Sequence, residues 1–174
     1  MTRSQAIAPG TNPGTPGKRG RGPLRSTIAR WPLDVDDGFE LWHPADPWVA
    51  LVKECVTDYR LGRADRASLA WSDDIVWRVI GGGPANGELR GANDVFEYHR
   101  RLEQMTAGSY RQELVALQAS GGPIVEAHVR TVAARAGHRI EIPTLIVFEL
   151  VGGRIKRVTE IPGDQQLWER FWAE

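Results

Sequence analysis

Four long runs of alternating polar and apolar residues fill the C-terminal part of the chain, and they limit the possible folds more than any other feature. Strand side chains alternate between two faces with a period of two, so each run predicts one β-strand. Glycine-containing turns at positions 121–123, 136–138 and 151–153 separate the runs, and such short turns join antiparallel neighbours. The sequence therefore predicts an antiparallel meander of four strands, Tyr110–Ala119, Ile124–Arg135, Arg139–Leu150 and Arg154–Ile161.

Helical patterns dominate the segment before these strands. Asp46-Pro47 predicts an N-cap followed by proline at the first helical position, and Gly62 predicts the end of that helix. A short helix over Asp65–Trp71, a strand over Ile75–Ile80 and a helix capped by Asn93 are expected next. The first helix carries an apolar stripe at helical spacing, made of Trp48, Leu51, Val52, Cys55, Val56 and Tyr59.

A last helix is predicted after Asp164, where it serves as a plug over a cone or as a dimer contact. Its apolar residues are Leu167, Trp168, Phe171 and Trp172. Helices that precede a meander of long antiparallel strands define the α+β class. We expect three helices on one face of a curled sheet, which encloses a conical cavity.

The strand Arg139–Leu150 carries apolar residues on both faces. Ile146 and Phe148 alternate with Leu145 and Val147, so neither face is simply exposed to water. We expect one face to line a pocket and the other to be buried in a homodimer.

Composition excludes several functional classes. The 22 basic and 22 acidic residues leave no net charge, which argues against a nucleic-acid partner because phosphate binding needs a basic surface. The single cysteine, Cys55, excludes an intramolecular disulfide and a cysteine-based zinc cluster. No apolar run is long enough for a membrane span, and no secretory signal is visible. We expect a cytoplasmic protein.

The charges are unevenly distributed along the chain. Residues 1–30 hold six basic groups and no acidic one, and the stretch 9–23 is rich in glycine and proline. Such a segment buries too little apolar area to offset the entropy of ordering it. We expect a disordered basic tail over residues 1–30, either an electrostatic arm or a flexible leader, and a single domain over residues 31–174.

Three segments resemble the SnoaL-like group of the NTF2-like superfamily. They are WSDDIVWRVIG at 71–81, GELRG at 87–91 before a helix, and VFELVGGRIKRVTEIPGDQ at 147–165. The resemblance covers about residues 46–174. It implies a cone-shaped barrel in which a curved, mostly antiparallel sheet wraps around three helices, usually as a homodimer with an apolar pocket for a small molecule. The superfamily contains both enzymes and non-catalytic binding proteins.

The resemblance extends to two enzymes position by position. The base, the phenol donor and the protonated acid of ketosteroid isomerase fall at Val79, Cys55 and Ile146, so isomerisation by that mechanism is not expected. The Arg and the two Asp of limonene-epoxide hydrolase fall at His128, Arg130 and Glu160. Its Tyr and Asn positions fall at Trp77 and Val79. An ionisable cluster is therefore retained in altered form.

Strand alternation partly supports that cluster. Glu126, His128 and Arg130 share one face of their strand. They either form an activated-water site with Glu160 in the pocket, or they lie on the outer, wet face, which is our expectation for Glu126. The predicted catalytic residues are His128, Arg130 and Glu160, with His or Glu as the base and Arg keeping the carboxylate ionised. The predicted pocket lining is Trp77, Val79, Cys55, Tyr59, Trp71, His99, Ile146, Phe148 and Val158.

The remaining motifs are weaker. Gly81-Gly82-Gly83 is either a mobile flap at the pocket mouth or an ordinary turn, and His99 is either a pocket residue or a satisfied core histidine. No motif for a nucleotide, flavin, haem or metal is present, so no cofactor is expected. Two hypotheses follow. The first is a cofactor-independent acid–base enzyme for a small apolar polyketide, terpenoid or steroid-like molecule, by ring opening or cyclisation. The second is a non-catalytic ligand-binding or dimerisation module.

Overall fold

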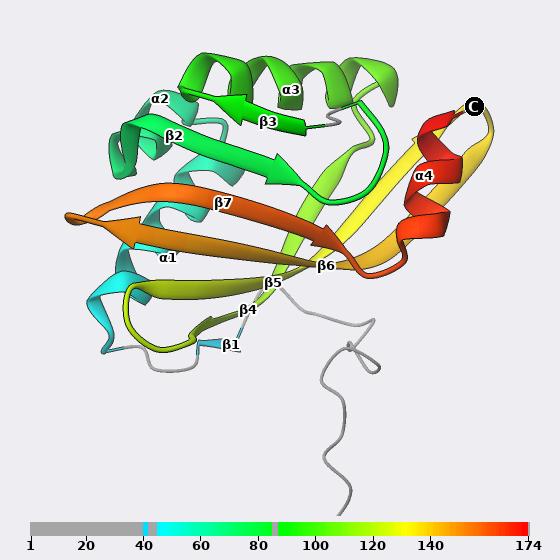
Figure 1. Cartoon of the computed structure of the whole chain (residues 1–174). Helices are drawn as coiled ribbons and strands as arrows, with labels where there is room; N and C mark the ends of the chain where they lie inside the picture. The colour runs from blue at the N-terminus through cyan, green and yellow to red at the C-terminus, as the bar shows by residue number, and fades with distance from the viewer. Residues whose placement is uncertain (1–39, 42–44, 85–86, 174) are drawn as a thin grey trace, which may run out of the picture.

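The computed structural model describes residues 40–41, 45–84 and 87–173, and Figure 1 shows their arrangement. The predicted tail at residues 1–30 lies outside the described residues. In chain order the elements are β1 (Glu40–Leu41), α1 (Pro47–Arg60), α2 (Ala64–Ala67), a 3₁₀ turn (Ser68–Ala70), β2 (Trp71–Val79), β3 (Gly87–Arg90), α3 (Ala92–Met105), β4 (Arg111–Ala119), β5 (Ile124–Arg135), β6 (His138–Val151), β7 (Arg154–Pro162) and α4 (Gln165–Ala173).

All described strands join one sheet, in the order β1-β4-β5-β6-β7-β2-β3. The predicted meander is confirmed, because β4 to β7 pair with their chain neighbours in antiparallel fashion. β2 pairs with β7 in parallel and places β3 at the edge, while β1 pairs with β4 in parallel. Figure 1 shows a curved sheet with α1, α2 and α3 gathered on one side, which confirms the α+β class.

The first helix forms as its sequence predicts. The Asp46 side chain accepts hydrogen bonds from the backbone N–H groups of Trp48 and Val49, and Pro47 takes the first helical position. These acceptors satisfy donors that the first helical turn leaves unpaired. Val49 and Val52 of α1 are fully buried against the core.

Three predicted boundaries between residues 64 and 106 need correction. The short helix α2 ends at Ala67 and is followed by the 3₁₀ turn to Ala70. Trp71 already belongs to β2, four residues before the predicted strand start at Ile75. The N-cap of α3 is Gly91, not Asn93, and its φ of 80° favours glycine. The Asp94 side chain instead accepts a hydrogen bond from the Arg90 backbone N–H.

The sheet register separates an inner from an outer face. Ala127, Ile146, Glu160 and Val79 lie opposite one another across β5, β6, β7 and β2, so their side chains share the inner face. Residues one position away along each strand point outward. The inner face packs against the helices and forms the core.

Helix α4 lies apart from the other helices and packs against the glycine run. Trp168 Nε1 donates to the Gly82 carbonyl oxygen at 2.7 Å, and a Cβ on Gly83 would lie 2.9 Å from the Trp172 ring. Neither α4 nor the glycine run lines the main cavity. The tryptophans hold these two segments to each other, which favours the ordinary turn over the mobile flap for Gly81-Gly82-Gly83. The alternatives for α4, a plug over the cone or a dimer contact, stay predictions.

Candidate functional site

A cavity of about 320 Å³ lies between the helices and the inner face of the sheet. That volume is within the usual range for small-molecule sites, roughly 300–1,000 Å³. Aromatic rings from α1, α3, β2, β6 and the residue before β4 make up much of its wall: Tyr59, Trp71, Trp77, His99, Tyr110 and Phe148. The site therefore suits a small ligand with a large apolar surface.

The structure places most of the predicted pocket residues in this wall. Those that line the cavity are Cys55, Tyr59, Trp71, Trp77, His99, Ile146 and Phe148. Val79 and Val158 lie on the same inner face and are buried, but they belong to the packed core beside the cavity. Period-two alternation placed these valines on the correct face, and the close packing around them keeps them out of the cavity wall.

Glu160 is the buried carboxyl group of the site, and only 2% of its surface is exposed. Gln112, a cavity-lining residue, donates from Nε2 to Glu160 Oε1 at 3.0 Å. Burial raises the pKa of Glu160 from 4.5 to about 6, and the hydrogen bond from Gln112 limits the rise. The Trp77 indole also lowers this pKa, although its Nε1 lies outside hydrogen-bonding geometry with any described residue.

Three tyrosines lie within electrostatic range of Glu160. Burial and the carboxylate together raise the pKa of Tyr59, Tyr98 and Tyr110, so all three phenols stay protonated at neutral pH. The hydroxyls of Tyr98 and Tyr110 are buried and have no hydrogen-bond partner among the described residues. Buried polar groups are usually paired, so these two unpaired hydroxyls make the surroundings of Glu160 a candidate functional site.

His99 is held in one orientation in the cavity wall. Its Nδ1 lies 2.9 Å from the Val95 carbonyl oxygen, and its ring makes edge contacts with Tyr59, Trp77 and Tyr98. Burial lowers the pKa of His99 from 6.5 to about 4, so the imidazole is neutral at physiological pH. His99 is thus a buried histidine with a hydrogen-bond partner and also a residue of the cavity wall, so the two alternatives predicted for it do not exclude each other.

Cys55 contributes packing to the cavity and no charge. The Trp71 indole donates from Nε1 to Cys55 Sγ at 3.3 Å. Burial raises the pKa of this thiol to about 11, so the nucleophilic thiolate is scarce at neutral pH.

The predicted convergence of His128, Arg130 and Glu160 is not found. His128 and Arg130 lie opposite Leu145 and Pro143 of β6 and share the outer face, whereas Glu160 is on the inner face. The side chains therefore point to opposite sides of the sheet. The prediction fails because register, and not alternation along a single strand, decides which residues of different strands share a face.

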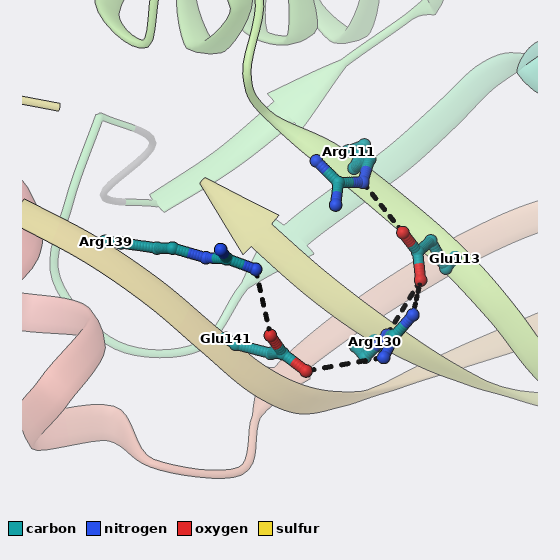
Figure 2. Close-up of polar contacts among 5 residues, drawn as sticks. All are labelled: Arg111, Glu113, Arg130, Arg139 and Glu141. Carbon is teal, nitrogen blue, oxygen red and sulfur yellow. Dashed lines mark hydrogen bonds and ion pairs between the residues drawn. The ribbon is translucent and has the colours of Figure 1, made fainter. Parts of the chain in front are cut away.

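Arg130 instead belongs to a network of five charged side chains, drawn in Figure 2, of which Arg111 and Glu113 also line the cavity. Arg130 donates from Nε to Glu113 Oε2 at 2.7 Å, and its Nη1 lies 3.4 Å from Glu141 Oε1. Arg111 bonds to Glu113 at 2.7 Å, and Arg139 bonds to Glu141 at 3.3 Å. The hydrogen bonds that Arg130 donates to Glu113 hold the guanidinium group away from Glu160.

His128 is largely buried on the same outer face, with 8% of its surface exposed. Its Nε2 lies 3.9 Å from Glu126 Oε2, and burial lowers the pKa of the imidazole. Glu126 itself accepts a hydrogen bond from Gln118 at 2.6 Å. This places Glu126 outside the pocket, on the face that strand alternation predicted for it.

Sequence reasoning missed three polar residues around Glu160: Tyr98, Tyr110 and Gln112. Tyr110 directly precedes β4 and is spaced by two from Gln112 and Leu114 of that strand, a period-two signal that marks the three as facing the same side. Tyr98 precedes His99 on α3 and carried no comparable signal. The described residues contain no group of three or more His, Cys, Asp or Glu side chains that could hold a metal ion. Within the same residues, no helix is long and apolar enough to cross a membrane.

Comparisons with known proteins identify the fold. No protein-family model and no curated protein matches the sequence. Among solved structures, Bal32a from a soil-derived mobile gene cassette is 23% identical, with a TM-score of 0.67 over 72% of this chain and 96% of that one. An NTF2-like protein from Burkholderia thailandensis E264 is 21% identical, with a TM-score of 0.64 over 71% of this chain and 95% of that one.

A protein from Jannaschia sp. CCS1, named as a SnoaL-like polyketide cyclase, is 12% identical, with a TM-score of 0.60 over 73% of this chain and 92% of that one. These likenesses, with the cavity and sheet described above, show that the chain has the NTF2-like fold. Within that fold, the SnoaL-like proteins are among its structural neighbours.

Proposed function

We propose that this protein is a cofactor-independent acid–base enzyme that acts on a small apolar molecule in the cavity. The observation that carries the proposal is Glu160, a buried carboxyl group with a pKa of about 6 that is hydrogen-bonded to Gln112 of the aromatic cavity wall. A pKa close to the working pH is what general acid–base catalysis requires. Perturbed carboxyl groups in clefts are also over-represented at active sites.

The chemistry that suits this arrangement is removal of a proton from a carbon next to a carbonyl group. With a pKa of about 6, Glu160 is mostly ionised at pH 7. It would accept the proton, the C–H electron pair would move into an enolate, and the protonated tyrosines would donate hydrogen bonds to the enolate oxygen. The enolate carbon would then regain the proton from Glu160, or it would attack a second carbonyl carbon of the same molecule, whose oxygen takes up the displaced electron pair and receives the proton from Glu160.

The positions of the charged residues favour cyclisation over ring opening by activated water. Ring opening in the predicted form needs His128 or Arg130 beside the carboxylate, and both lie on the outer face of the sheet. Cyclisation through an enolate needs one base and neutral donors. Glu160 and the phenols of Tyr59 and Tyr110 are groups of those two kinds.

A proton-exchange experiment tests the proposal without knowledge of the natural substrate. The probe is 2-tetralone in D₂O, and proton NMR follows deuterium incorporation next to its carbonyl group. Glu160→Gln is expected to lower the protein-dependent exchange rate by roughly 10²–10⁴, the usual size of acid–base catalysis. Glu126→Gln, the same substitution on the outer face, is the matched control and is expected to exchange at the wild-type rate. Equal rates for wild type and Glu160→Gln would refute the proposal.

A ligand-binding module without catalysis is the second candidate. One observation favours it: Gln112 lines the cavity, while the Glu160 carboxyl group to which it bonds lies behind the wall. This candidate predicts that 2-tetralone binds and quenches tryptophan fluorescence but exchanges no deuterium beyond the buffer rate.

We also propose that the outer face of the sheet pairs with a second copy of the chain. Leu145, Val147 and Ile161 are half-buried there, next to the largely buried His128. Apolar side chains clustered on an open sheet face are typical of protein interfaces. A homodimer would cover them and leave the cavity on the opposite side of each sheet.

A further inference from the structure

We propose that His99 selects ligands that carry a hydroxyl or N–H group, whose hydrogen it accepts through Nε2. This inference rests on the cavity being the ligand site, as in the proposed function, and it needs no catalytic turnover. It defines the ligand class as an apolar, ring-containing molecule with at least one hydrogen-bond donor.

The tautomer of His99 follows from its helix contact. Nδ1 lies 2.9 Å from the Val95 carbonyl oxygen, and a carbonyl oxygen can only accept a hydrogen bond. Nδ1 therefore carries the hydrogen. In a neutral imidazole the other nitrogen then holds a lone pair, so Nε2 is an acceptor.

The imidazole keeps this state across the physiological pH range. Burial holds the pKa of His99 at about 4. The ring also has little freedom to turn, since its centroid lies 5.0 Å from Tyr59, 5.4 Å from Trp77 and 5.1 Å from Tyr98. Among the described residues, the side-chain hydrogen bond of His99 is made through Nδ1. Nε2 is not one of their enclosed polar atoms that lack a partner, so Nε2 keeps some exposed surface. Because His99 lines the cavity, Nε2 opens into it.

Other polar groups of the cavity wall differ from this acceptor. Gln112 donates to Glu160, Arg111 donates to Glu113, and the carboxyl groups of Glu103 and Glu113 also line the cavity. The Tyr59 phenol is protonated, whereas the Tyr110 hydroxyl is enclosed. His99 supplies a neutral acceptor that is held among aromatic rings.

The selectivity arises because a ligand without a hydrogen-bond donor leaves Nε2 of His99 unpaired. An apolar ligand removes water from Nε2 and offers no hydrogen in return, and leaving a buried acceptor unsatisfied is costly. A ligand with a hydroxyl group keeps the acceptor paired. We expect a preference of about tenfold or more, the size of one such hydrogen bond.

The experiment compares two probes of nearly equal shape, 2-naphthol and 2-methylnaphthalene. Quenching of tryptophan fluorescence reports binding, because Trp71 and Trp77 line the cavity. His99→Phe keeps an aromatic ring and removes the acceptor, and Val95 O keeps its backbone hydrogen bond within the helix. We expect the ratio of the two affinities to fall about tenfold in this variant relative to wild type, with 2-methylnaphthalene bound as before. His99→Gln, which retains an acceptor oxygen, is expected to restore part of the ratio.

An NMR measurement on the wild-type protein tests the same inference without a variant. The ¹⁵N signal of His99 Nε2 is expected to shift with 2-naphthol and to stay in place with 2-methylnaphthalene. An unchanged affinity ratio in His99→Phe, an unmoved Nε2 signal, or failure of both probes to bind would each overturn the inference. If the wild-type protein prefers 2-naphthol as expected but catalyses no deuterium exchange, the proposed enzyme activity is refuted and the inference about His99 stands.

Discussion

The ionisation of Glu160 should make the stability of this protein depend on pH in a direction opposite to that of most carboxyl groups. The perturbation is Glu160→Gln, which replaces the buried carboxyl group with a neutral side chain of the same shape. In the wild type, burial raises the pKa from 4.5 to about 6. Below pH 4.5 the group is protonated in the folded and the unfolded chain and contributes no pH dependence.

The magnitude follows from proton linkage. Between pH 4.5 and pH 6 the unfolded chain releases its proton while the folded chain keeps it, so the free energy of unfolding falls as pH rises. Above pH 6 the folded protein bears the full free-energy cost of burying the ionised carboxylate. A shift of about 1.5 pKa units corresponds to about 2 kcal/mol. Glu160→Gln avoids this cost, so its advantage over wild type should grow by about 2 kcal/mol from about pH 4 to about pH 7.5.

Urea denaturation of both proteins at four or five pH values measures this difference. Other titrating groups, His99 among them, are common to both proteins and cancel in the comparison. A second variant, Gln112→Leu, removes the hydrogen bond that lowers the pKa of Glu160 and should move the midpoint of the effect to higher pH. A difference between wild type and Glu160→Gln that stays constant within about 0.5 kcal/mol over this range would refute the argument, since burial would then not penalise the charge.

Two further predictions concern the buried histidine of the cavity wall and the outer face of the sheet. Burial lowers the pKa of His99 from 6.5 to about 4, so the wild type should lose about 3 kcal/mol of stability as pH falls from 6.5 to about 4, because the unfolded chain binds a proton that the folded chain refuses. In urea denaturation, His99→Phe should not show this fall in the free energy of unfolding at acid pH. The same fall in both proteins would contradict the lowered pKa of His99. Light scattering should give about twice the chain mass of 19.3 kDa, and Leu145→Glu, which places a charge on the half-buried outer face, should return the monomer mass. A wild-type monomer at micromolar concentration would show that this face has no second copy on it.

The meander could be predicted well from the sequence because long period-two runs and glycine turns are local signals. The run Ile124–Arg135 matches β5 at both ends. Asp46 and Asp164 were placed correctly at helix starts, where each accepts a backbone hydrogen bond. Alternation does not predict the parallel pairing of β2 with β7, because no pattern within one strand records which distant strand will lie beside it.

The candidate site was predicted in part, for the same reason. The apolar wall followed from helix stripes and strand alternation, which fix the direction of each side chain relative to its own element. The grouping of His128 and Arg130 with Glu160 required knowledge of register across three strands, and it failed by one position on β6. The Gln112–Glu160 hydrogen bond joins residues 48 positions apart, and no local pattern carries information over that separation.

The parallel pair of β2 and β7 also determines when the cavity can form during folding. β4 to β7 join through tight turns, and their contacts require only short loops to close. Trp71 pairs with Ile155 across more than 80 residues of chain, and closing a loop of that length is entropically costly and slow. Trp71 and Trp77 reach Ile146 and Phe148 only when that step is complete. A bound ligand would therefore hold together the latest-forming contact of the molecule, and it should slow unfolding more than it speeds folding.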